Sequence, residues 1–282
     1  MNPSTLHEPL AQDLTRRFSA FPEVEAIGVG GSLASGAADP SSDIDLYVFC
    51  HTLVPLPARQ AITAEMNATR ADLNLTMWDV GDEWYDGATG IEVDVIYWSP
   101  AWIEEQLNRL WVQHQPSMGY STCFWTTMRN LRILFDRNGW LAKLSEHARQ
   151  PYPEALRLGI IEKNHAVLRH IIPSYTHQIE KVARRGDLVS LNHRVAALLA
   201  SYFDVLFALN YALHPGEKRL LNWAQTLCPL RPQRMVEEVE AVLRAAIDSQ
   251  ALPQRVHTLI DSLDKLLLQE GFDPQTSKPL FK

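Results

Sequence analysis

Two aspartates separated by one residue stand at the start of an apolar segment that runs from residue 43 to residue 49. Because successive side chains of a strand point to opposite faces, Asp43 and Asp45 are predicted to share one face, while Ile44 and Leu46 enter the core. Two carboxylates this close repel each other unless a cation lies between them. Mg²⁺ prefers such oxygen ligands and commonly bridges protein carboxylates to substrate phosphates. The pair is therefore a candidate metal site.

A turn suited to phosphate precedes the two aspartates. The apolar run 27–29 is followed by Gly30, Gly31 and Ser32, and glycines allow a tight turn and a close approach of the backbone to a ligand. Ser32 offers a hydroxyl and a backbone N–H at the expected start of a short helix, where the helix dipole also favours phosphate oxygens. Gly36 is expected to end that helical turn. We predict that Gly31 and Ser32 bind nucleotide phosphates.

The turn, the polar loop after it and the paired acids at the start of an apolar strand resemble the signature of the polymerase-β-type nucleotidyltransferase superfamily. In this chain the signature reads Gly31-Ser32 followed by Asp43-x-Asp45. The segment 31–36 is similar to the version found in small-molecule antibiotic nucleotidyltransferases of the aminoglycoside and lincosamide type, although Ser35 stands where those relatives often carry Arg. The resemblance implies transfer of a nucleoside monophosphate, with two Mg²⁺ ions held by the paired acids. Taken singly, either half of the signature is commonly structural.

The segment 91–98 repeats the alternation of acids and apolar residues. It places Glu92 and Asp94 on one face of a predicted strand, with Val93 and Val95 on the other. The superfamily uses a third carboxylate on a neighbouring strand, and the Val-Asp-Val setting of Asp94 resembles that position. The resemblance implies that Asp94 binds the catalytic metal and takes or orients the proton of the attacking hydroxyl, with Glu92 as the alternative base. From the residues alone, two solvated acids on a half-exposed strand are the alternative.

The elements that must position these residues alternate between helices and strands over the first half of the chain. Apolar spacing predicts a helix over 5–20, strands over 24–29 and 44–50, a helix over 57–69, a strand over 73–78, a turn-rich loop over 79–90 and a strand over 91–98. A helix over 101–114, an apolar run within 129–136 and a helix over 140–148 follow.

Beyond residue 150 every periodic signal is helical. Apolar residues recur at three and four over 154–184, 188–213, 219–228, 232–247 and 252–269, and Pro173 should kink or split the first of these helices. The predicted fold class is α+β: a nucleotidyltransferase domain over residues 1–150, with a mixed β-sheet flanked by helices, followed by an all-α helical bundle over 151–282.

Two basic residues of the helical half are assigned by the resemblance. Aminoglycoside nucleotidyltransferases, to which the chain is similar, carry an Arg and a later Lys in their helical domain that reach the triphosphate. By order and context, this implies that Arg194 and Lys218 contact the phosphates of ATP. On the residues alone, solvated helix charges are the alternative.

Composition and charge narrow the class of protein. Of 282 residues, 46% are hydrophobic and 21% are charged, as in ordinary globular proteins. A formal net charge of −7 argues against a long nucleic-acid partner, because phosphate binding depends on Lys and Arg. The three cysteines lack Cys-x-x-Cys spacing and the ten histidines lack metal-binding spacing, so we expect a reducing cytoplasm and no zinc site.

A secretory signal and a membrane span are not expected. The N-terminal residues are acidic and polar, and the apolar span 195–213 is interrupted by Asp204 and by other polar residues. This span is therefore predicted to be a central bundle helix. A buried acid such as Asp204 then needs a polar partner or a cleft.

Four acids and two aromatics gather in the segment 79–86, which is predicted to be a loop beside the strand that carries Asp94. Acids pair with ammonium groups, and aromatic rings lie against sugars or cations. The expected acceptor is a small cationic polyol of the aminoglycoside kind, seated between the two domains. A solvated acidic loop in an acidic protein is the alternative. The expected acceptor contacts are Asp82, Glu83, Trp84, Asp86, Asp187 and Asp204.

Three functions fit these residues. The first is an enzyme that moves AMP from ATP onto a hydroxyl of a small molecule such as an aminoglycoside-like antibiotic and releases pyrophosphate, which would serve antibiotic resistance. The second enzyme applies the same chemistry to a protein side chain. The third is a catalytically inactive nucleotide-sensing module, against which the intact set of Ser32, Asp43, Asp45 and Asp94 speaks. The sequence predicts no oligomeric state.

Overall fold

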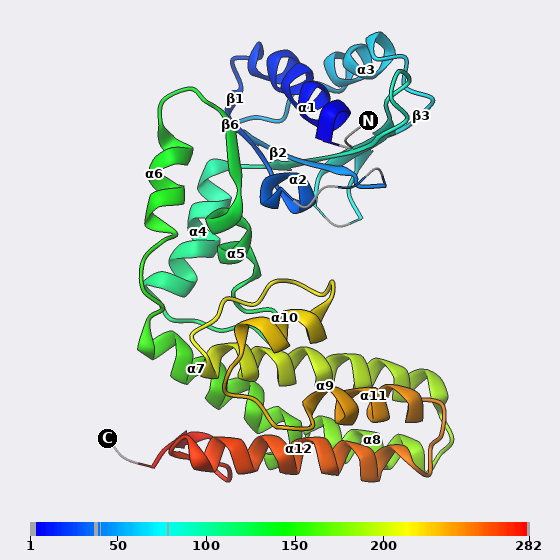
Figure 1. The fold of residues 1–282 in the computed structure, drawn as a ribbon, viewed down its shortest axis with the longest axis vertical. Coiled ribbons are helices and arrows are strands. Elements are labelled where there is room, and N and C mark those ends of the chain that lie inside the picture. The colour runs from blue at the N-terminus through cyan, green and yellow to red at the C-terminus, as the bar shows by residue number, and fades with distance from the viewer. Residues whose placement is uncertain (1–3, 37–38, 40, 78, 281–282) are drawn as a thin grey trace. The chain divides into compact units, whose positions relative to one another are not determined.

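The computed structural model describes residues 4–36, 39, 41–77 and 79–280, and it has the mixed α+β architecture that the sequence predicts (Figure 1). The chain forms two compact units. The first comprises Met1–Leu107 and Thr127–Gln150, and the second comprises Asn108–Thr126 and Pro151–Lys282. The segment 108–126 thus belongs to the second unit, whereas the predicted boundary near residue 150 assigned it to the first domain.

The first unit is built on a six-stranded sheet with the strand order β3-β4-β5-β2-β1-β6. Strands β2 and β5 are parallel, and the other neighbouring pairs are antiparallel, so the sheet is mixed as predicted. The strands are β1 (Val24–Val29), β2 (Ile44–Cys50), β3 (Arg70–Leu75), β4 (Gly81–Tyr85), β5 (Glu92–Trp98) and β6 (Arg132–Asp136).

One face of this sheet is apolar and packs against helices α1 (Ser4–Ser19) and α3 (Leu56–Glu65). Phe18 of α1 and Ile62 of α3 belong to the same buried cluster as side chains of β1, β2 and β5. Ile44 and Leu46 of β2 are fully buried in this cluster, as their alternation predicts. The intervening residues of β2 therefore point to the opposite face of the sheet.

The other helices of this half connect the strands and lead into the second unit. They are α2 (Gly31–Ser35), α4 (Pro100–Trp111), α5 (Cys123–Asn130) and α6 (Trp140–His147). Helix α4 begins in the first unit and ends in the second, and α5 begins in the second and ends in the first. Because the chain crosses between units inside helices, the hydrophobic pattern does not break there, and the sequence gives no sign of the crossing.

Strand β4 and helix α5 differ from expectation. Strand β4 lies where the sequence predicts a turn-rich loop over 79–90, because its inward positions include a charged residue rather than only apolar ones. Helix α5 falls in a segment for which no element was predicted. The predicted strands over 24–29 and 44–50 are confirmed with the same bounds.

The second unit is helical over most of its length. A π-helical turn, η1, follows α7 directly, and the chain breaks at Pro173 before α8, as predicted. A two-stranded hairpin, β7 with β8, follows the last helix, where no strand was expected, and it stays separate from the main sheet. The elements are α7 (Glu154–His165), η1 (Ala166–His170), α8 (Tyr175–Ala183), α9 (Leu188–Leu209), α10 (Leu220–Leu227), α11 (Met235–Ala245), α12 (Leu252–Gln269), β7 (Phe272–Asp273) and β8 (Lys278–Pro279).

Helix α9 is the central helix of this unit and packs against both α7 and α8 (Figure 1). All its residues from Ser201 to Leu209 are buried, which agrees with the prediction of a central bundle helix. Across the described residues, no helix is both long and apolar enough to cross a membrane.

Candidate active site

The central pair of parallel strands brings two predicted carboxylates side by side. Asp45 of β2 and Asp94 of β5 are directly paired in the register of these strands. Val93 and Val95, which flank Asp94, are fully buried, so Asp94 lies on the opposite face. Asp43 directly precedes β2, and all three acids are half-buried. The structure therefore assembles the three predicted metal-binding acids in one region of the first unit.

The acidic register continues beyond this pair. Glu83 of β4 is the register partner of Asp94, and Asp72 of β3 is the register partner of Glu83. Paired residues on neighbouring strands share a face and are separated by about 4.8 Å of sheet width. Four carboxylates, Asp45, Asp94, Glu83 and Asp72, thus form one row across four strands. We call it the acidic row.

Electrostatic repulsion within this row is visible in Asp94. The pKa of Asp94 is raised to about 7, first by burial and then by the negative charges of Asp45, Glu83 and Asp43. Either protonation of the carboxyl or a bound cation removes this repulsion. An all-oxygen donor set that carries such repulsion fits Mg²⁺.

The glycine turn is seated directly on this acidic site. Gly31 has a φ of +57°, and a Cβ placed on it would lie 1.9 Å from Oδ2 of Asp45. A Cβ on Gly30 would lie 2.7 Å from Cε2 of Tyr47. The Gly30 N–H donates a 2.9 Å hydrogen bond to the Asp45 carbonyl, which fixes the turn to β2. Only a residue without a side chain fits at Gly31.

Helix α2 begins at Gly31 and ends as predicted. Gly36 adopts the left-handed conformation with a φ of 72°, and its N–H donates to the Ser32 carbonyl. Ser32 lies in the first turn and is half-buried. The side chain of Ser35, where relatives often carry Arg, lies outside the described part of the structure.

Two residues predicted to contact the acceptor instead point into the core. Asp82 is 1% exposed and forms a buried ion pair with Arg59 at 2.5 Å. It also accepts a 2.7 Å hydrogen bond from the Tyr97 hydroxyl. Trp84 is likewise 1% exposed. The predicted acceptor roles of Asp82 and Trp84 are corrected by this strand geometry, because only Glu83 and Tyr85 of β4 lie on the open face.

Two further predicted acceptor contacts have structural roles. Asp86 is buried and accepts hydrogen bonds from the backbone N–H and hydroxyl of Thr89, which closes the turn after β4. Asp187 is the N-cap of α9 and accepts from the N–H and hydroxyl of Ser190. Their side-chain oxygens therefore satisfy turn and helix donors. Burial corrects the predicted acceptor contact of Asp86, whereas that of the exposed Asp187 stays a prediction.

Asp204 belongs to a buried polar network in the second unit. It accepts hydrogen bonds from the N–H and hydroxyl of Ser121, at 3.0 and 2.6 Å, and from Nδ2 of Asn164 at 3.1 Å. Burial raises its pKa to about 7. The expectation that Asp204 has polar partners is confirmed, and these partners replace the predicted acceptor contact.

The two predicted phosphate-binding basic residues lie in the second unit. Arg194 is on α9 and Lys218 lies between α9 and α10, and both side chains are exposed. Among the described residues, the structure shows no structural role for either side chain.

The acidic row borders a small hollow on β3, β4 and β5. A cavity of about 170 Å³ is lined by Arg70, Asp72, Glu83, Trp84, Tyr85 and Glu92. The sequence analysis did not single out Asp72, because only the pairing of β3 with β4 brings it into the row. No local motif marks this residue.

Comparisons with known proteins agree with the geometry of the first unit. Residues 10–109 match the family described as the nucleotidyltransferase domain, and residues 122–220 match a family described as a domain of unknown function, DUF4037. A crystal structure of a nucleotidyltransferase-like protein from Exiguobacterium sibiricum 255-15 is similar at 16% identity, over 93% of this chain and 75% of that chain, with a TM-score of 0.46. No curated protein matches the chain.

Residues 10–109 are therefore similar to a nucleotidyltransferase domain, which is consistent with the polymerase-β-type superfamily. This confirms the resemblance drawn from the Gly31-Ser32 turn and the Asp43-x-Asp45 pair. Domains of this family transfer a nucleotidyl group from a nucleoside triphosphate with the help of a divalent metal ion.

Proposed function

We propose that the protein transfers AMP from ATP to a hydroxyl of a small cationic molecule, such as an aminoglycoside-like antibiotic, and releases pyrophosphate. The observation that carries this proposal is the direct pairing of Asp45 with Asp94 beneath the glycine turn at Gly31. A phosphate-binding turn and an acidic pair in contact with each other are what a nucleotidyl transfer requires.

The acids at this site fit Mg²⁺ in type and number. Asp43, Asp45 and Asp94 offer only carboxylate oxygens, and burial together with mutual repulsion raises the pKa of Asp94, so the site favours added positive charge. When bound, two Mg²⁺ ions supply charge neutralisation for the triphosphate and for the departing pyrophosphate.

The residues of the chain have separate tasks in this reaction. Asp94 orients the acceptor hydroxyl and receives its proton. The backbone at Gly31 and Ser32 holds phosphate oxygens. For Arg194 and Lys218, support for a phosphate contact comes from the resemblance alone.

A cationic acceptor is supported by the charge next to Asp94. The acidic row extends from Asp94 to Glu83 and Asp72, and the cavity beside it also includes Glu92. Tyr85 is 37% exposed on the same face of β4 and offers an aromatic ring where the sequence analysis expected Trp84 to do so. The lining carries three acids and a single cation, Arg70, so its net charge is negative. A negatively charged surface attracts the ammonium groups of an acceptor.

The test is an acceptor screen with labelled ATP. The purified chain is incubated with ATP labelled at the α-phosphate, Mg²⁺ and a panel that pairs aminoglycosides with neutral polyols of similar size. We expect mass spectrometry to find an AMP adduct on cationic acceptors and none with the Asp45→Asn variant. Labelling of a protein instead would assign the chain to protein adenylyl transfer, and transfer to neutral polyols alone would refute the cationic acceptor.

A further inference from the structure

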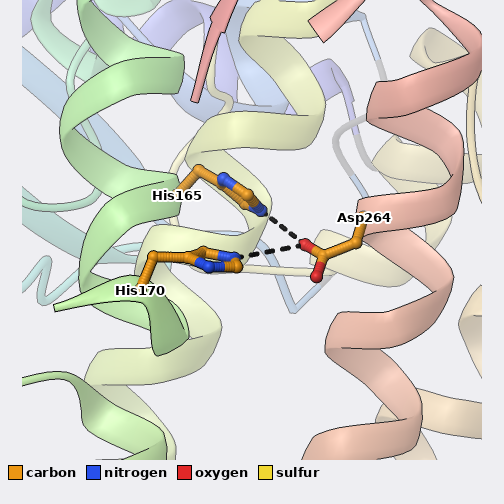
Figure 2. A group of neighbouring side chains, drawn as sticks. All are labelled: His165, His170 and Asp264. Atoms are coloured by element: carbon orange, nitrogen blue, oxygen red, sulfur yellow. Dashed lines mark hydrogen bonds and ion pairs between the residues drawn. The ribbon is translucent and has the colours of Figure 1, made fainter. Parts of the chain in front are cut away.

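Three side chains from separate helical segments of the second unit converge on one point (Figure 2). His165 ends α7, His170 ends η1 and Asp264 lies on α12. One ligand atom from each lies within 4.8 Å of the others. Nε2 of His165 is 2.6 Å from Oδ1 of Asp264, and Nε2 of His170 is 3.6 Å from the same oxygen. Among the described residues, no other group of three metal-ligating side chains comes this close together.

The π-helical turn is what aligns the two histidines. In an α-helix, residues five apart are rotated by about 140° around the axis and face different directions. In the π-helical turn η1 the hydrogen bonds span five residues instead of four, and this wider turn brings His170 closer to the side of the helix that carries His165. Their rings are 4.8 Å apart between centroids. The π-helical turn, a rare geometry, thus brings the two imidazole rings to the same side of the helix.

Burial shields the three side chains from solvent. The side chain of His165 is fully buried, and those of His170 and Asp264 are 8% and 13% exposed. Nε2 of His170 is buried, and at 3.6 Å from Oδ1 of Asp264 it is too far for a hydrogen bond to that oxygen. A buried nitrogen without a hydrogen bond costs free energy, so this atom requires an explanation.

We propose that His165, His170 and Asp264 bind a divalent transition-metal ion of the Zn²⁺ class, at a site separate from the nucleotidyl-transfer chemistry. Bonds of 2.0 to 2.1 Å to Zn²⁺ place tetrahedral ligand atoms about 3.4 Å apart. The separation of 3.6 Å between His170 and Asp264 already fits. His165 and Asp264, at 2.6 Å, need to separate by less than about 1 Å.

The surrounding groups prepare the ligands for this task. Nδ1 of His165 lies 2.8 Å from the hydroxyl of the buried Ser277, which leaves Nε2 directed at Asp264. Arg169 pairs with Oδ2 of Asp264, so that Oδ1 is the oxygen left for a metal ion. On metal binding the His165 proton moves to Nδ1 and is donated to Ser277. Outer partners of this kind orient the ligands of established metal sites.

Three protein ligands leave one coordination position for water or another ligand. Because Ser277 lies in the turn between β7 and β8, the ion would tie this hairpin to α7, η1 and α12. Two histidines and one carboxylate suit Zn²⁺, Fe²⁺ or Co²⁺ better than Mg²⁺, which prefers oxygen ligands.

The experiment is a Zn²⁺ titration of the full chain, read by calorimetry and by NMR of the imidazole nitrogens. The Asp45→Asn variant serves as the parent protein, so that the acidic site of the first unit contributes little. We expect one equivalent to bind, with shifts at Nε2 of His165 and His170. His170→Gln should weaken this binding tenfold or more.

A matched control is His257→Gln. His257 pairs with Glu180 at 2.8 Å in the same unit, and these two belong to no three-ligand group among the described residues, so the loss of His257 should leave Zn²⁺ binding unchanged. Arg169→Gln should tighten binding, because it removes a competing cation and frees Oδ2 of Asp264. A simple ion-pair network predicts no gain from this change.

Several outcomes would overturn the site. They are the absence of Zn²⁺ binding, equal binding by His170→Gln and the parent, equal losses in His170→Gln and His257→Gln, or no shift at the two Nε2 atoms. Melting in the presence of EDTA checks that His170→Gln folds as its parent does. If His170→Gln does not fold as its parent does, the NMR shifts of the parent and the Zn²⁺ affinity of Arg169→Gln decide whether the metal site exists.

Discussion

Asp45 and Asp94 are directly paired across two parallel strands, and the pKa of Asp94 is raised to about 7 by burial and by neighbouring negative charges, of which that of Asp45 has the largest effect. The two acids hold each other in an unfavourable state that a cation relieves. The repulsion lowers the stability of the metal-free protein, and a bound cation removes it.

Replacing Asp45 with Asn should abolish nucleotidyl transfer while leaving the fold intact. It removes a ligand and a repelling charge, so the pKa of Asp94 should fall toward its usual range. NMR titration of the Asp94 carboxyl carbon measures this directly. Thermal melting without Mg²⁺ should be level or higher than in the wild type. Pyrophosphate release by this variant at the wild-type rate would refute the role assigned to Asp45.

Adding a methyl group at Gly31 should disrupt the site more than the fold. In Gly31→Ala the new Cβ would meet Asp45, and the φ of +57° costs roughly 1 to 2 kcal/mol for a residue with a side chain. Gly36→Ala is the matched control, because Gly36 also has a positive φ but no atom within 4 Å of its Cβ position. We expect similar losses of stability and a loss of transfer rate, measured at saturating ATP, only for Gly31→Ala.

Neutralising Asp82 should destabilise the first unit without affecting the acceptor. Asp82→Asn leaves the buried Arg59 guanidinium uncompensated, and breaking buried pairs of this kind costs about 3 to 5 kcal/mol. Urea unfolding measures the loss. The acceptor KM of the fraction that stays folded should match the wild type. A large rise in acceptor KM with unchanged stability would restore Asp82 to the acceptor site.

Neutralising Glu83 should have the opposite effect. Glu83 is exposed in the acidic row, so Glu83→Gln should leave the unfolding free energy within about 0.5 kcal/mol of the wild type. It should raise the KM for a cationic acceptor several-fold and leave the KM for ATP unchanged. The effect should shrink as salt concentration rises, because exposed charges are screened. A salt-independent effect would exclude electrostatic recognition.

The metal-free protein should lose stability as pH rises from about 4 to 7. Asp94 has a folded-state pKa of about 7, above that of the unfolded chain, so the folded state binds more protons in this window. Its favourable contribution is present at low pH and is lost as pH approaches 7. Asp204 shifts in the same direction, so the measurement is the difference in unfolding free energy between the wild type and Asp94→Asn, in EDTA. A pH-independent difference would contradict the assignment.

Local sequence patterns were sufficient for the core of the site. Strand β2 was predicted with the bounds it has, because Ile44 and Leu46 alternate with acids and are buried. Strand β4 was missed because Asp82, an inward-facing residue, reads as polar surface. Its burial depends on Arg59, which lies 23 residues earlier in the chain. No local rule shows such a partner.

The remaining surprises also depend on long-range arrangement. Asp72 enters the acidic row only through the pairing of β3 with β4. His165 and His170, five residues apart, match no face of an α-helix, and Asp264 is almost a hundred residues away, at a separation of 99 from His165. The histidine spacing therefore suggested no metal site, and only the π-helical turn reveals the cluster.

The chain leaves the first unit for residues 108–126 and then returns to it, which determines where a fragment of the protein can be cut. The nucleotidyltransferase match ends at residue 109, yet β6, which covers the edge of β1, comes from residues 132–136. A fragment cut at the end of the match would expose the backbone donors and acceptors of β1 along an open edge, which is a template for aggregation. The matched family is thus shorter than the unit that completes the six-stranded sheet.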